Sequence, residues 1–508
     1  MKSKSDVSVV QRIVAALANS RFMWLIMGLF LLQALWLALS GRYPMAFDED
    51  FHLGVIRLYA HHPNPFWTIA PSDSGQFGAI SRDPSYLYHY LMSFPYRLIS
   101  LFTGDQTIQV LILRFINIAF FASGLVLFRR LLLRTGASRA IVHACLLLFV
   151  FIPIVPLLAA QINYDNLLLP VVALVLIVAD RVSSQLAKQK QFSLLDLGFL
   201  LSLGLLGCLV KYAFLPILMT ISIFIIVRLW QTYHSWRAFG HALRRSFTKL
   251  TATGRLGLLA ILLLSSLLFM QRYGVNVVRY HTPIPSCDKV LSVKACSSYG
   301  PWYRDYIYSQ HKLPGSHSPL TYASDWIYGM WLRTFFSVGG PGTDFETRGP
   351  LLLPALFGIL VSAVSLLLIA MYGKRVFRKY NSKLLWLFVS MAAVYASVLW
   401  LDGYRAFLTT AQPVAINGRY LLPVLLPVSL IAGLCWSEWL GKRSNYKVAA
   451  VSIMVLSLIW GGGALTFVLR SNANWYWPNK YVVNVNKAIR DTTGPVVPGY
   501  YRPTEFLR

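Results

Sequence analysis

The sequence predicts an all-α integral membrane protein with about eleven transmembrane helices. The chain has 508 residues, of which 56% are hydrophobic and only 13% charged, whereas a soluble protein carries about 25% charged residues. Apolar runs long enough to cross a bilayer, which takes about 17–25 residues, recur along the whole chain. Lys and Arg gather in alternate connecting segments, the pattern that sets orientation in membrane proteins. Together these features indicate a helical protein that crosses the membrane many times.

The apolar runs place the spans in order along the chain. The first run ends in small residues, as a signal peptide does, but its apolar stretch is too long for one, so we interpret it as an uncleaved span. The eleven predicted spans cover residues 22–40, 107–128, 140–160, 165–180, 194–210, 212–229, 256–271, 351–372, 384–401, 417–437 and 448–469.

The charge distribution predicts the orientation. With the N-terminus inside, the inner loops hold more than half of the 47 Lys and Arg residues. The acidic residues on that side are Asp6, Asp180, Asp196 and Glu438. The net charge of +28 therefore reports topology, and nucleic-acid binding is not expected. An odd number of spans puts the C-terminus outside.

Residues 85–102 form a segment that could be a further span. A span there would put the basic segment 129–139 outside and invert every later loop. The segment is also rich in Tyr and carries His89 and Arg97, so we interpret it as an amphipathic helix in the outer interface. The inner segment 228–255 reads as a basic amphipathic stretch on the opposite membrane surface.

We treat residues 1–469 as one transmembrane domain. Its outer parts are a first outer loop at 41–106 and a large outer loop at 272–350, and residues 470–508 form an outer tail. Cys287 and Cys296 are nine residues apart in the large loop. In an oxidising compartment this spacing predicts a disulfide, with two unpaired thiols as the alternative.

Polar residues that are costly at a membrane boundary fall on the outer side. Charges in such places are candidates for function. Plainer alternatives are that Lys211 snorkels, that Asp165 caps a helix and that Arg114 pairs with a carboxylate. The candidates are Asp48, Glu49, His52, Arg114, Asn163, Asp165, Lys211, Arg419 and Tyr420.

Carboxylates opposite cations at a lipid–water boundary suit one kind of chemistry. Arg and Lys can hold a lipid-borne phosphate while a carboxylate takes a proton from an attacking hydroxyl. Asp48 and Glu49 could instead anchor a divalent cation, Mg or Mn. We expect Asp48 to face the cavity, and Glu49 and Asp50 to point toward neighbouring loops or water, because consecutive helical residues point about 100° apart.

The chain resembles the C-type membrane glycosyltransferases, a superfamily that includes protein O-mannosyltransferases and the lipid A aminoarabinose transferase. "FDEDFH" (47–52) is similar to the family's acidic pair after the first span, and "RDPSYLYHYLMSFPYRLISLFTGDQTIQVLILRF" (82–115) to its interfacial helices and Arg-bearing second span. "INYDN" (162–166) and "NGRYLLPVLLP" (417–427) resemble an Asn-x-Asp turn and a Gly-Arg-Tyr-x-x-Pro motif of one bacterial branch. Asp50 departs from that branch, which often has Pro there.

The resemblance implies a glycosyltransferase of the bacterial inner membrane, acting on the periplasmic face with inversion. The donor would be a polyprenyl-phosphate-linked sugar and the acceptor a glycan, lipid or protein. Asp48 would be the base or the metal anchor, Glu49 its helper, and His52 a proton donor to the leaving phosphate. The residues implied to bind phosphate or substrate are Arg419, Lys211, Tyr420, Arg114, Asp165 and Asn163.

Two other functions stay open at the level of the sequence. A polymerase or ligase of lipid-linked glycans would use a pyrophosphate carrier on the same face. A transporter or flippase of lipid-linked sugars would usually place its polar residues near the bilayer midplane, within repeated halves. The predicted spans carry few midplane charges and show no repeat, which favours transfer over transport.

Overall fold

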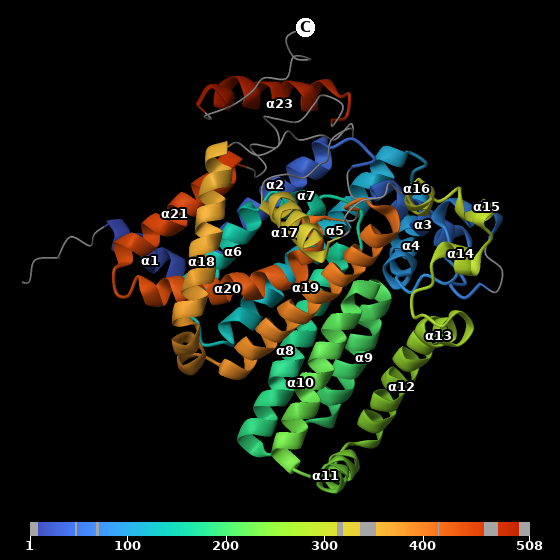
Figure 1. The fold of residues 1–508 in the computed structure, drawn as a ribbon, viewed down its shortest axis with the longest axis horizontal. Helices are drawn as coiled ribbons and strands as arrows, with labels where there is room; N and C mark the ends of the chain where they lie inside the picture. Colours follow the sequence, from blue (N-terminus) through green and yellow to red (C-terminus); the bar gives the residue numbers. More distant parts are fainter. Residues whose placement is uncertain are drawn as a thin grey trace, which may run out of the picture.

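The computed structural model describes residues 9–45, 48–67, 71–311, 318–335, 352–414, 416–461 and 476–496. Within these ranges the protein is helical throughout, with one isolated β-bridge between Gly41 and Tyr476 and no strand (Figure 1). The predicted all-α class is therefore confirmed for the described part of the chain.

The helices of the N-terminal half carry the first outer loop and most of the core. They are α1 (Val9–Ala18), α2 (Phe22–Ser40), α3 (Glu49–His61), η1 (Ser72–Phe77), α4 (Leu87–Ser100), α5 (Gln106–Leu133), α6 (Arg139–Phe151), α7 (Ile154–Ala159), α8 (Asp165–Gln189), α9 (Leu194–Val210), η2 (Tyr212–Phe214), α10 (Leu215–Tyr233) and α11 (Trp236–Thr248).

The remaining helices carry the large outer loop, the last spans and the tail. They are α12 (Ala252–Phe269), η3 (Met270–Gly274), α13 (Val275–Tyr280), α14 (Cys287–Val290), α15 (Val293–Cys296), α16 (Gly300–Gln310), α17 (Pro319–Phe335), α18 (Leu352–Lys379), α19 (Ser382–Thr410), η4 (Gly418–Leu421), α20 (Leu422–Trp439), α21 (Ser444–Gly461), α23 (Lys480–Thr493) and η6 (Gly494–Val496).

Eight of the described helices are long and apolar enough to cross a membrane. Each coincides with a predicted span. The three other predicted spans, at 140–160, 194–210 and 448–469, coincide with the shorter apolar helices α6, α9 and α21, and residues 462–469 lie outside the described part. The first of the three is divided into α6 and α7 at Pro153, because proline ends a helix by removing a backbone donor.

The tail gives independent information on the number of crossings. Trp477 donates its backbone N–H to the carbonyl of Ser40 (3.0 Å), and Trp36 donates its indole N–H to Asn486 (3.2 Å). The tail therefore lies at the C-terminal end of α2, where α23 is seen in Figure 1. If α2 crosses the membrane, an odd number of crossings must separate its start from the tail. The long apolar helices of the described part are eight, an even number, so eight crossings alone do not give this arrangement.

The helix that precedes the large outer loop is longer than predicted. The span expected at 256–271 continues through a π-helical turn, η3, to Tyr280, so the first residues of the expected loop at 272–350 are helical. Arg272 accounts for this extension, because its buried guanidinium donates to the carbonyls of Pro65 (2.6 Å) and Ser81. The end of the helix is thereby held against the first outer loop.

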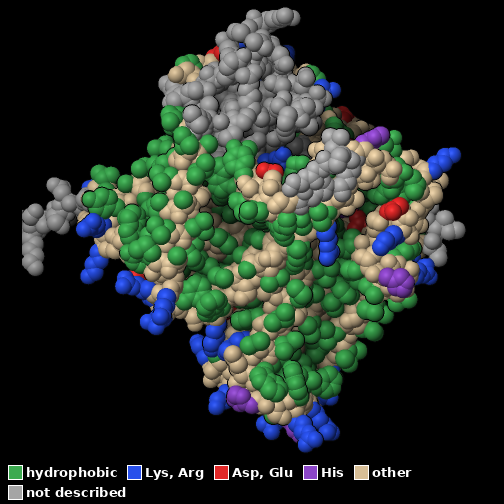
Figure 2. Space-filling model, in the orientation of Figure 1, with side chains coloured by type: hydrophobic (Ala, Val, Ile, Leu, Met, Phe, Trp, Pro, Cys, Tyr) green, Lys and Arg blue, Asp and Glu red, His purple; other side chains and the backbone are tan. Residues whose placement is uncertain are grey.

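Two amphipathic segments form helices at their predicted places. α4 is too short to count as a span, and it buries His89 and Met92 while exposing Leu91 and Phe94. Its position matches the predicted interfacial helix at 85–102. α11, inside the basic segment 228–255, buries no residue. Many Lys and Arg side chains lie along the left and lower edges of the face in Figure 2, near α1 and α11.

The predicted disulfide is present in the large outer loop. Cys287 and Cys296 are bonded, with their Cα atoms 5.9 Å apart. The bond joins the short helices α14 and α15. Cys145, Cys208 and Cys435 are buried and free, in agreement with their positions in apolar runs.

Candidate functional site

The first element of the candidate site is the pair formed by Asp48 and Arg419. Asp48 precedes α3, and its backbone is left-handed (φ 66°, ψ 33°), a conformation that Asn and Asp tolerate better than most residues. Its side chain is 58% exposed and accepts a hydrogen bond from Arg419 Nη2 at 2.9 Å. Arg419, from η4, is 5% exposed. A water-facing carboxylate therefore covers a buried guanidinium.

A second ion pair lies beside the first. Lys211 sits at the break between α9 and η2 and donates to Asp165 Oδ1 at 2.6 Å. Its Nζ lies 4.5 Å from the ring centre of Tyr164 and 5.0 Å from that of Tyr420. Arg419 lies 5.2 Å from the same Tyr420 ring. The two cations thus share one aromatic wall, which joins the ion pairs into a single cluster.

The structure therefore brings together residues predicted from distant parts of the chain. Asp48, Asp165, Lys211, Arg419 and Tyr420 meet at the ends of α3, α8, α9 and η4. Both oxygens of Asp165 are buried, and Oδ2 has no hydrogen-bond partner among the described residues. The cluster holds two cations, one exposed carboxylate and one buried carboxylate with a free acceptor atom.

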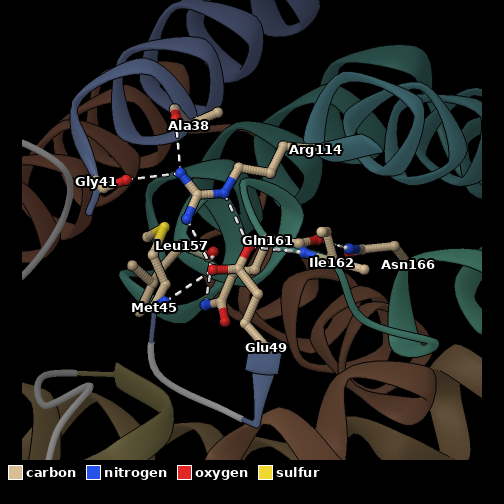
Figure 3. A network of polar contacts seen from close by, with 9 residues as sticks. All are labelled: Ala38, Gly41, Met45, Glu49, Arg114, Leu157, Gln161, Ile162 and Asn166. Carbon is tan, nitrogen blue, oxygen red and sulfur yellow. Dashed lines mark hydrogen bonds and ion pairs between the residues drawn. The ribbon is translucent and has the colours of Figure 1, made fainter. Parts of the chain in front are cut away.

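Glu49 does not belong to this cluster. Of the two directions expected for it, it turns away from water and toward neighbouring connecting segments. It is fully buried and accepts from Arg114 Nε (2.8 Å) and Nη2 (2.7 Å), as Figure 3 shows. The backbone N–H groups of Met45 (2.7 Å) and Ile162 (3.2 Å) complete its hydrogen bonds. Every lone-pair direction of this carboxylate is used within the protein.

The guanidinium of Arg114 is likewise hydrogen-bonded within the protein. Its Nη1 donates to the carbonyls of Ala38 (2.9 Å) and Gly41 (2.6 Å), and its side chain is fully buried (Figure 3). The predicted contact between Arg114 and a substrate phosphate does not agree with this geometry. The geometry agrees instead with the alternative given above, that Arg114 pairs with a carboxylate. Glu49 and Arg114 tie the end of α2, the start of α3, α5 and the segment before α8 into one structure.

Asn163 also supports the backbone. Its side-chain oxygen accepts from the N–H of Asp165 (3.0 Å), and its own N–H donates to Asn117 on α5 (3.3 Å). Asn117 also accepts from Tyr88 (2.8 Å) and Asn166 (3.1 Å). The turn at 161–166 is therefore held in place from α5, and this positions Asp165 toward Lys211.

His52 belongs to a buried chain of hydrogen bonds that the sequence reasoning did not include. His89 Nδ1 lies 3.1 Å from the carbonyl of Ser85, which can only accept, so this nitrogen carries a proton. In a neutral ring His89 Nε2 then accepts from His52 Nδ1, at 2.8 Å. His52 Nε2 is left without a proton. The expectation that His52 donates to a leaving phosphate does not fit this tautomer.

Burial lowers the pKa of both rings, that of His89 to about 3, and the proximity of His89 lowers the pKa of His52 further. A histidine held neutral in the fold favours folding fully above about pH 6.5 and progressively less below it, because the unfolded chain binds the proton. At pH 5 the loss is about 2 kcal/mol for a ring whose pKa is as low as that of His89.

We expect His89→Gln to reduce the acid sensitivity of the fold, because its amide can donate to Ser85 and accept from His52 without titrating. Melting temperatures in mild detergent between pH 7 and pH 5 measure the effect. His61→Gln, at the exposed end of α3, is the matched control and should follow the wild type. Equal acid sensitivity in the wild type and His89→Gln would show that the pair is not held neutral.

The two residues predicted to anchor a metal point in different directions. Asp48 reaches Arg419, and Glu49 reaches Arg114. No group of three His, Cys, Asp or Glu side chains with metal-binding geometry occurs among the described residues. Because Glu49 has no free lone pair, Asp48 and Glu49 do not fit a shared cation.

Two further residues at or beside the cluster, Tyr164 and His89, were missed from the sequence. Tyr164 contacts Lys211, and its ring centre lies 4.6 Å from that of His52. It stands between Asn163 and Asp165, so its place in the motif "INYDN" was a usable signal. His89 is visible as one histidine in an apolar, Tyr-rich helix, but nothing in the sequence pairs it with His52.

Comparison with protein-family models, curated proteins and solved structures finds no match to this chain.

Proposed function

We propose that this chain is a membrane glycosyltransferase of the C type, which moves a sugar from a polyprenyl-phosphate donor to a glycan, lipid or protein acceptor. The observation that carries the proposal is the ion pair between the exposed Asp48 carboxylate and the buried Arg419, which lies beside the Lys211–Asp165 pair. A phosphate needs cations with directed donors, and an attacking hydroxyl needs a carboxylate within reach. The cluster offers both at the end of apolar helices.

In the proposed reaction Arg419 and Lys211 hold the donor phosphate, and Tyr164 and Tyr420 keep the two cations in place. Asp48 takes the proton of the acceptor hydroxyl while the oxygen of that hydroxyl attacks the anomeric carbon of the donor sugar. The bond between that carbon and the phosphate oxygen breaks, and the phosphate leaves on the lipid carrier. The two cations stabilise the negative charge that the leaving phosphate gains. A single displacement of this kind inverts the anomeric centre. We assign the site to the periplasmic face of a bacterial inner membrane.

The test is transfer by the purified protein in lipid vesicles. Radiolabelled polyprenyl-phosphate sugars are supplied as a panel, with extracted bacterial membranes as acceptor. We expect transfer from at least one donor. Arg419→Ala should raise the donor KM about tenfold or more, because a charge-assisted hydrogen bond contributes about 1.5–3 kcal/mol.

Arg405→Ala, at an exposed position of α19, is the matched control and should leave the donor KM unchanged. If no donor is used, but the vesicles move a lipid-linked sugar from one leaflet to the other, the protein is a transporter and the proposal is wrong.

A further inference from the structure

A long apolar slot lies away from the polar cluster, between α6, α18, α20 and α21. Its volume is about 470 Å³, within the range of about 300–1,000 Å³ typical of ligand sites. Its walls are almost entirely apolar. Representative wall residues are Cys145, Phe149, Val361, Ala432 and Met454.

The slot runs along α20, from Leu425 to Leu440. At a rise of 1.5 Å per residue these positions are about 22 Å apart. Trp331 and Phe335 of α17 line one end, and Lys447 of α21 lines the other. Of the described residues that line the slot, only Lys447 is charged. The shape suits one extended hydrocarbon chain better than a compact ligand.

The Lys447 end of the slot is surrounded by cations. Lys442 and Arg443 are exposed in the turn between α20 and α21, and Arg12 of α1 and Arg139 at the start of α6 are exposed on neighbouring helices. The helices α1, α18 and α21 lie together on the left of the view in Figure 1. The nearby acid, Glu438, is already paired with Lys379. This end therefore presents an excess of positive charge.

We propose that the slot binds one acyl chain of an anionic phospholipid, whose headgroup lies beside Lys447, Lys442 and Arg443. An apolar slot this long has no polar partners for water along most of its length, so a hydrocarbon chain is its suitable occupant. Basic residues at a membrane surface attract anionic headgroups, at about 1 kcal/mol each. The lipid belongs to the leaflet on the basic side, opposite the leaflet of the proposed donor, so the inference does not depend on the proposed function.

The donor's isoprenoid chain is the main competitor for the slot. The cations assigned to its phosphate, Arg419 and Lys211, lie beyond the other end of α20, the end at which Trp331 and Phe335 of α17 line the slot. A chain whose phosphate sits at Lys447 cannot place that phosphate at Arg419. The charges at the Lys447 end therefore favour a phospholipid.

The experiment is native mass spectrometry of the protein purified in mild detergent, with the released lipids identified. We expect bound phosphatidylglycerol or cardiolipin, enriched over its share of the membrane. Ala432→Trp should fill the slot and reduce the bound lipid about tenfold, whereas Leu264→Trp, on the exposed face of α12, should leave it unchanged. A bound isoprenoid lipid, detergent alone, or equal lipid in Ala432→Trp would overturn the proposal.

A second measurement covers the case in which Ala432→Trp fails to fold. Added phosphatidylglycerol should raise the melting temperature of the delipidated wild type more than added phosphatidylcholine does, because a ligand that binds only the folded state stabilises it. Lys447→Gln should lose this difference between the two lipids. An equal response to both lipids in the wild type would contradict an anionic headgroup site.

Discussion

Arg114→Ala is expected to destabilise the protein more than any other single change at the candidate site, by about 3–5 kcal/mol. The substitution leaves the Glu49 carboxylate fully buried with two of its four hydrogen bonds lost. It also frees the carbonyls of Ala38 and Gly41. The melting temperature in mild detergent, followed by size-exclusion chromatography, measures the effect. Arg181→Ala, which breaks a half-exposed pair with Asp196, is the control and should cost about 0–1 kcal/mol.

A double variant separates a structural role of the pair from a catalytic one. Glu49→Leu combined with Arg114→Met removes both charges, and replacing a buried pair by apolar residues is often neutral. We expect the double variant to recover much of the stability that Arg114→Ala loses. A stable but inactive Glu49→Gln would contradict this reading, because it would mean that Glu49 acts in the chemistry.

Much of the fold was open to prediction because membrane helices obey a simple rule. Backbone groups in lipid must be paired within a helix, so each apolar run of sufficient length becomes one. The eight long apolar helices follow from this rule. The rule does not predict where a helix ends when a distant side chain holds it. Arg272 holds the continuation of α12, through η3 and α13 to Tyr280, by bonds to carbonyls 191 and 207 residues earlier. No local pattern reports such a contact.

The candidate site was predictable in its members but not in their pairing. The sequence indicates that Asp48, Asp165, Lys211 and Arg419 lie on one side of the membrane, because topology alone decides the side. It does not indicate that Glu49 turns inward. Asp48 and Glu49 are adjacent and chemically similar, and their directions depend on the left-handed backbone at Asp48 and on Arg114 from α5. Both features arise from tertiary packing.

Asp48→Asn is expected to reduce transfer by about 10²–10⁴, the range typical for loss of a general base. Asn is the informative replacement because it tolerates the left-handed backbone that Asp48 adopts, whereas most other residues would strain it. Its amide oxygen can still accept from Arg419. The fold and the donor KM should therefore stay close to those of the wild type while kcat falls.

The matched control is Asp50→Asn, two residues further along the same helix turn. Asp50 is exposed and takes part in no ion pair among the described residues, so its variant should keep nearly full activity. Glu49→Gln should lose activity only in step with folded protein, since the buried charge of Arg114 then has no counter-charge. Normal turnover by Asp48→Asn, with a large loss in Asp165→Asn, would move the role of base to Asp165, whose Oδ2 accepts no hydrogen bond from the described residues. Full activity in both variants would remove the carboxylate from the mechanism, and with it the reason to assign glycosyl transfer to this site.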